Sequence, residues 1–167
     1  ATVTMEEMSG AAVAHGSAKP ARRALLTADQ AQSLVAYELA RARGYDARPL
    51  RWAYVIDEGV PRTAAGKPLF SMAGMDEPQT SGPSTALLYG SGFGAITLAQ
   101  TKTTPALSEQ LEQLPVALIE TTANGSAMRS LTTPLGGALI WRQGDTTLIA
   151  GGFVTKAELE AFVQTVR

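Results

Sequence analysis

Two apolar segments with polar residues between them lie near the end of the chain, from residue 138 to residue 151. The segments ALIWRQ and TTLIAG flank Gly144-Asp145, a dipeptide that favours tight hairpin turns. With a two-residue loop at this point, Trp141 lies opposite Leu148 on one side of the sheet. The pattern therefore predicts an antiparallel hairpin with an apolar face.

After the hairpin the periodicity changes from two residues to that of a helix. Thr155 fits the N-cap position, and Glu158, three residues later, completes a capping box. Apolar residues then follow at the spacing of one helix face. These are Leu159, Phe162, Val163 and Val166.

A second helix is predicted from Thr27 to Arg43. Thr27 fits the N-cap, Gln30 completes a capping box, and Gly44 fits a left-handed stop. Its apolar face would consist of Ala28, Ala31, Leu34, Val35, Leu39 and Ala42.

The remaining pattern predicts strands that follow one another along the chain. Residues 50–56 alternate, with one apolar face made of Leu50, Trp52, Tyr54 and Ile56. The segments STALLY, FGAITLAQTK and VALIETT also have strand character, and residues 105–114 indicate a short helix. We therefore expect an α+β fold, a curved antiparallel sheet of about five to seven strands with helices packed on one face. Residues 1–24 form an arm with weak periodicity, and residues 25–167 form a single domain.

The composition and net charge of the chain restrict the classes of partner that we expect it to bind. The chain of 167 residues carries 14 Lys and Arg against 15 Asp and Glu, a net charge of −1. This balance disfavours nucleic acid, which usually binds a basic face. The absence of cysteine excludes disulfides and thiolate metal sites. The chain begins at Ala1, which fits either N-terminal processing or a soluble fragment of a longer membrane-anchored protein.

Candidate catalytic groups are sparse. His15 is the sole histidine, so it alone would have to serve any catalytic triad, and we expect a surface or docking role for it. The glycine-rich segment 90–94 is followed by a strand instead of the helix that a phosphate loop needs, which favours a hairpin turn. The paired carboxylates are expected to be surface charges. They are Asp57-Glu58, Asp76-Glu77, and Glu109 with Glu112. The sequence therefore predicts no enzyme, cofactor or metal.

A long proline-containing loop, from residue 58 to residue 83, is the least ordinary feature. Loops of this length inside a compact domain tend to be functional or mobile. Its centre is apolar, and flexible methionines suit adaptable binding surfaces, although they also cap open cores. The candidate contacts for an apolar ligand or a partner are Leu69, Phe70, Met72 and Met75, together with Trp52 and Trp141.

The stretch from Thr85 onward resembles an uncharacterised bacterial domain family found in extracytoplasmic regions of anti-sigma factors and in some lipoproteins. The similar pieces are ALLYGSGFGAITLAQTK, VALIETT and ALIWRQGDTTLIAGGFVTKAELEAFVQTV. TADQAQSLVAYEL resembles the opening helix of that family. At one further remove, the pattern is similar to that of lipoprotein-carrier folds. The resemblance implies an extracytoplasmic location, periplasmic or on the cell surface, with membrane anchoring through a segment absent from this chain.

Two functions follow as expectations. The first is a non-enzymatic sensor or regulatory domain that acts through protein contacts. The alternative is a carrier that binds an acyl chain or another apolar small molecule between sheet and helices, with the loop 58–83 as a lid. The carrier predicts an apolar cavity of a few hundred Å³.

Overall fold

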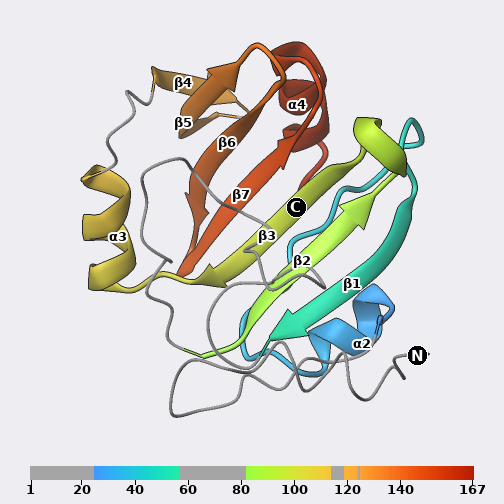
Figure 1. Ribbon diagram of the computed structural model, residues 1–167. Coiled ribbons are helices and arrows are strands. Elements are labelled where there is room, and N and C mark those ends of the chain that lie inside the picture. The colour runs from blue at the N-terminus through green and yellow to red at the C-terminus, as the bar shows by residue number, and fades with distance from the viewer. Residues whose placement is uncertain (1–24, 57–81, 114–118, 124) are drawn as a thin grey trace, which may run out of the picture.

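The computed structural model describes residues 25–56, 82–113, 119–123 and 125–167, which form one open sheet with helices against it (Figure 1). Seven antiparallel strands are arranged in the order β1-β2-β3-β7-β6-β5-β4. The strands are β1 (Leu50–Ile56), β2 (Ser84–Tyr89), β3 (Ile96–Lys102), β4 (Ile119–Ala123), β5 (Ser126–Thr133), β6 (Gly136–Gln143) and β7 (Thr146–Gly152). The predicted α+β class with a curved antiparallel sheet is confirmed.

The C-terminal hairpin has the predicted register. Trp141 pairs with Leu148, and the last pair before the turn joins Gln143 to Thr146. Gly144 adopts a positive φ of 59°, the left-handed conformation that glycine adopts at no steric cost. Strand β5 and its two-residue connection to β6, at residues 134–135, were not specified by the sequence pattern.

Among the described residues, four short helical elements accompany the sheet. They are α2 (Ala28–Gln32), the 3₁₀ turn η1 (Gly92–Gly94), α3 (Pro105–Glu112) and α4 (Lys156–Val163). The capping box of α4 forms as predicted, because Thr155 Oγ1 accepts from Glu158 N and Glu158 accepts from Thr155 N. The predicted apolar stripe of α4 is buried throughout.

The two faces of the sheet are covered by different elements. On one face, α4 packs over β6 and β7, and Phe162 lies at the centre of the main core with Tyr89 and Tyr45 at its ring edges. On the opposite face, Leu107 and Leu111 of α3 pack against Ile140 and the half-buried Ile149. We expected the helices to pack on one face of the sheet. Instead, α4 packs on one face and α3 packs on the opposite face.

The first helix is much shorter than predicted. Its capping box forms between Thr27 and Gln30, but α2 ends at Gln32, and residues 37–43 cross the α4 side of the sheet in non-helical conformation. We call residues 37–43 the strap. Gln32 uses its side-chain amide to donate to the carbonyl of Tyr37 and to accept from the backbone N–H of Leu39.

The strap is held by tertiary partners that the local sequence does not contain. Arg41 and Arg167 exchange two backbone hydrogen bonds, of 2.9 and 3.0 Å, and Tyr89 accepts from the N–H of Ala42. These bonds replace the intrahelical ones, so helical spacing between Leu34 and Ala42 was a wrong guide. The prediction of a helix to Arg43 is corrected for this reason.

Strand β1 packs against the main core through Ala53 and Val55, which belong to the face that the sequence pattern shows as less apolar. Ala53 and Val55 are fully buried in that core, next to Leu87 of β2. Trp52 and Tyr54 point to the opposite face and form an aromatic pair with centroids 5.2 Å apart. The strand is apolar on both faces, so alternation alone did not identify the core side.

Candidate functional site

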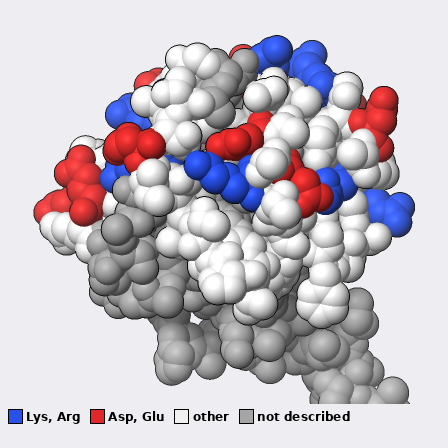
Figure 2. Space-filling model, turned by 90° about the horizontal axis from the view of Figure 1, so that it is seen from above, with Lys and Arg blue, Asp and Glu red and all other residues white. Residues whose placement is uncertain are grey.

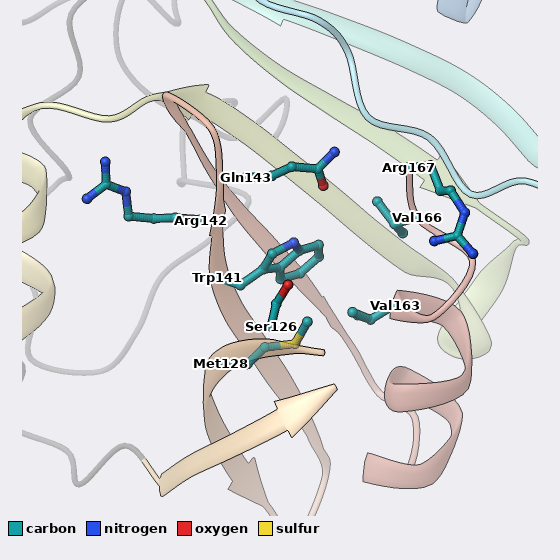
Figure 3. Close-up of a pocket in the computed structure, with 8 residues that line it drawn as sticks. All are labelled: Ser126, Met128, Trp141, Arg142, Gln143, Val163, Val166 and Arg167. Atoms are coloured by element: carbon teal, nitrogen blue, oxygen red, sulfur yellow. The ribbon is translucent and has the colours of Figure 1, made fainter. Parts of the chain in front are cut away.

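Two adjoining clefts lie on the strap side of the sheet, near the β6–β7 turn, and share Gln143 as a common wall. We call the first the Trp141 cleft. It has a volume of about 200 Å³ and lies between the sheet and the end of α4 (Figure 3). Its lining residues are Ser126, Met128, Trp141, Arg142, Gln143, Val163, Val166 and Arg167.

The Trp141 cleft has an apolar floor and a polar rim. Met128, Trp141, Val163 and Val166 converge in Figure 3, and all four are buried side chains of the main core. The side chain of Arg142 points away from them toward α3, so Arg142 contributes to the wall near its backbone only. The cleft therefore offers apolar contact below and hydrogen-bonding groups at its edge.

The second cleft, which we call the Gln100 cleft, has a volume of about 310 Å³. It is bounded by the strap on one side and by the β6–β7 turn on the other. Its lining residues are Tyr37, Glu38, Ala40, Gln100, Gln143, Gly144, Asp145, Thr146 and Leu148.

The polar groups at the base of the Gln100 cleft already have partners. Gln100 is 1% exposed, and its side-chain amide bonds both backbone groups of Ala40. The hydroxyl of Tyr37 lies 3.1 to 3.3 Å from Gln100 O, Pro83 O and Thr85 Oγ1. Burial raises the pKa of Tyr37 to about 12, so the phenol stays protonated at neutral pH. These groups position the strap and are poorly suited to proton transfer.

The rims of the two clefts differ in charge. Glu38 and Asp145 are exposed at the Gln100 cleft, whereas Arg167 is exposed at the Trp141 cleft. Since Gln143 lies between them, an elongated ligand that spans both clefts would meet acidic groups at one end and a guanidinium at the other. Its middle would lie over the apolar floor.

The volumes of the two clefts limit the size of the ligand that each can hold. Sites for drug-sized molecules usually measure about 300–1,000 Å³. The two clefts, at about 200 and 310 Å³, are at or below the lower limit of that range. Each accommodates one or two amino-acid side chains more readily than a whole acyl chain.

Of the six residues predicted to contact a ligand or partner, the structure describes Trp52 and Trp141, and these two lie on opposite faces of the sheet. Trp141 belongs to the first cleft, whereas Trp52 lies on the opposite face of the sheet, on the edge strand β1. Leu69, Phe70, Met72 and Met75 lie outside the described residues, as do His15, Asp57-Glu58 and Asp76-Glu77.

The carboxylates of α3 are where the surface interpretation placed them. Glu109 and Glu112 are both exposed. In the part of the chain that the structure describes, no group of three or more His, Cys, Asp or Glu side chains is arranged to hold a metal ion. Within the same residues, no helix is long and apolar enough to cross a membrane.

Sequence reasoning missed the structural roles of Tyr37, Gln100 and Gln143. Gln100 did leave a signal, because it follows Ile96 and Leu98 on the inward face of β3, where an apolar residue is expected. A buried polar side chain requires a hydrogen-bond partner, which indicates a backbone segment passing over the sheet.

Comparison of the chain with protein-family models, with curated proteins and with solved structures finds no match.

Proposed function

We propose that this chain is a non-enzymatic sensor or regulatory domain, acting outside the cytoplasm, that binds an extended segment of a partner protein across the two clefts. The observation that carries the proposal is the pair of small clefts joined at Gln143, with an apolar floor and rims of opposite charge. The extracytoplasmic location rests on the sequence resemblance alone.

The chemistry of the clefts specifies the partner segment. A basic side chain at one end would pair with Glu38 and Asp145. An apolar side chain would pack on Trp141, and a carboxylate would face Arg167. Extended peptides place successive side chains in separate small pockets, which fits two clefts of this size better than one deep cavity.

The buried polar groups beside the Gln100 cleft already have hydrogen-bond partners, and this supports a binding role for the cleft. Tyr37 and Gln100 use their side chains to hold the strap that forms one wall of the Gln100 cleft. A wall fixed by several hydrogen bonds is preorganised, so a ligand does not have to order it on binding.

A display library of 12-residue peptides, selected on the full chain, tests the proposal. Selected peptides should share a basic residue and, a few positions away, an apolar residue. The variant Glu38→Gln/Asp145→Asn should weaken their binding roughly 3- to 10-fold, the range for losing two exposed ion pairs. The matched control Glu109→Gln/Glu112→Gln, on α3, should bind like the unmodified chain. Selection of no consensus, or equal loss in both variants, would exclude these clefts as the site.

The carrier remains the second candidate because the Trp141 cleft lies between the sheet and α4, where a carrier would hold its ligand. Native mass spectrometry of gently purified protein separates the two functions. An adduct of lipid-like mass that disappears on denaturation supports the carrier, and a clean apo mass favours peptide binding.

A further inference from the structure

Three large apolar side chains are exposed together at one end of the sheet. Phe93 is 85% exposed, Leu135 is 74% exposed and Phe153 is 62% exposed. They come from three connections, between β2 and β3, between β5 and β6, and between β7 and α4. We call these three residues the apolar tip. It lies at the upper end of the sheet in Figure 1, whereas the β6–β7 turn beside the clefts lies at the lower end.

The backbone holds the three connections close together. The rings of Phe93 and Phe153 make an edge contact, with centroids 6.1 Å apart. A Cβ on Gly136, the residue after Leu135, would lie 2.9 Å from the Cα of Phe153. Glycine at this position therefore allows the β5–β6 turn to approach the β7–α4 connection.

The half-buried side chain of Arg48 holds the same region in place through hydrogen bonds. Arg48 donates from Nε to the carbonyl of Gly94 at 2.6 Å, and from its terminal nitrogens to Glu158 and Tyr45. The guanidinium thereby ties the β2–β3 connection to the start of α4. Phe93 and Phe153 are therefore exposed on connections that hydrogen bonds hold in place.

The three segments that form the apolar tip carry no charged side chain. Residues 90–95, 132–137 and 151–154 contain no Asp, Glu, Lys or Arg. Figure 2 views this end of the molecule and shows uncharged surface beside a band in which acidic and basic side chains alternate. In that region the charges of Arg48 and Glu158 are paired with each other at 2.6 Å.

We propose that the apolar tip inserts into the interfacial region of a lipid bilayer, with the neighbouring charged band remaining in water. Protein interfaces are enriched in Tyr, Trp, Phe and Arg and have hydrogen-bonding rims. The three turns of the tip contain no Tyr, Trp or Arg. Their exposed Phe and Leu side chains and their lack of charge suit the acyl boundary. The mixed signs of the band disfavour attraction to anionic lipid, so binding is apolar and independent of headgroup charge.

The expected strength is modest. A single myristoyl chain gives an association constant of about 10⁴ M⁻¹ with membranes, and three partly exposed side chains supply no more apolar surface than that. The tip therefore orients a domain that is already near a membrane. Strand β7, about 20 Å long, separates the tip from the β6–β7 turn, so the clefts would face away from the bilayer. This inference does not depend on what the clefts bind.

Flotation of the full chain with phosphatidylcholine vesicles at millimolar lipid tests the proposal. The unmodified chain should float, and Phe93→Ser/Leu135→Ser/Phe153→Ser should lower its partition constant at least 10-fold. The matched control Leu25→Ser/Ile119→Ser removes two other large apolar side chains, 62% and 60% exposed, and should stay within twofold. Raising NaCl from 50 to 500 mM should also change partition less than twofold.

The orientation has a separate readout because the chain contains no cysteine. An environment-sensitive dye on Ser91→Cys should brighten when phosphatidylcholine vesicles are added, and the same dye on Asp145→Cys should not. Failure of the unmodified chain to float, brightening at both positions, or a steep fall with salt would each overturn the proposal. Loss of self-association by the triple variant, in a chain that does not float, would assign the tip to protein contact instead.

Discussion

Gln100 binds Ala40 as a neighbouring strand would. Its Oε1 accepts from the Ala40 N–H at 2.8 Å, and its Nε2 donates to the Ala40 carbonyl at 2.7 Å. Both residues are buried, so neither backbone group of Ala40 has access to water as a substitute. One side chain on β3 thus satisfies the backbone of a strap 60 residues earlier in the chain.

Replacing Gln100 by leucine should therefore destabilise the fold more than its size suggests. Gln100→Leu leaves two buried backbone groups unpaired, at a cost of about 1–3 kcal/mol each. Chemical denaturation should show a loss of roughly 2–5 kcal/mol in the free energy of unfolding. The control Gln113→Leu removes an exposed amide that bonds only Glu109, and should change stability by less than about 0.5 kcal/mol. Similar losses in the two variants would contradict the bracing role of Gln100.

Gly152 should not tolerate a side chain. A Cβ at this position would lie 2.4 Å from the carbonyl oxygen of Ala95, the residue just before the neighbouring strand β3, and the backbone would have to move. Gly152→Ala should cost about 1–3 kcal/mol, the usual range for overpacking. Gly94→Ala is the matched control, because a Cβ there meets nothing within 4 Å. Thermal unfolding of both variants checks this, and an unchanged Tm for Gly152→Ala would refute the close approach of β7 to β3.

Tyr37 should make stability fall in alkaline solution. Its pKa in the folded chain is raised by burial to about 12, above the ordinary value of 10.0. Between pH 10 and pH 12 the unfolded chain releases this proton and the folded chain keeps it, so stability declines as pH rises. The advantage of the unmodified chain over Tyr37→Phe should shrink by on the order of 2 kcal/mol across this window. Urea denaturation at each pH measures it, and a constant difference would exclude the effect.

Glu158 should act in the acid range with the opposite sign. Hydrogen bonds from the Thr155 backbone, and then from Arg48, lower its pKa from 4.5 to about 2. Its stabilising contribution is present above pH 4.5 and is lost as pH falls toward 2. Glu158→Gln keeps a side chain suited to the capping box but removes the charge, so its Tm should fall less steeply over that range.

The contribution of Glu158 is limited by its exposure, since solvent and salt screen exposed charges. The difference between the two Tm profiles should therefore narrow in 0.5 M salt. Glu160→Gln is the control, because Glu160 makes only an i,i+4 pair with Lys156 at 3.6 Å. A Glu160→Gln profile as shallow as that of Glu158→Gln would show that the capping-box carboxylate has no special role.

The candidate site was predicted only in part. Trp141 was named from the sequence and does line a cleft, but the Gln143 junction and the acidic rim at Glu38 and Asp145 were not foreseen. These residues come from segments far apart in sequence, and nothing local to any one of them marks it as a neighbour of the others. The apolar tip was missed for the same reason, because Phe93, Leu135 and Phe153 are each ordinary as single loop residues.

The sequence by itself determined the elements whose start, face and stop depend on nearby residues. The capping box at Thr155, the apolar stripe of α4 and the turn at Gly144 are all governed by contacts within a few positions. Only the tertiary structure decided what happens to residues 34–43, where helical spacing competes with hydrogen bonds from Gln100, Tyr89 and Arg167. Helix propensity is worth tenths of a kcal/mol per residue, whereas an unpaired buried backbone group costs one or more. The distant partners therefore outweigh the local pattern, and the strap crosses the sheet where a helix was predicted.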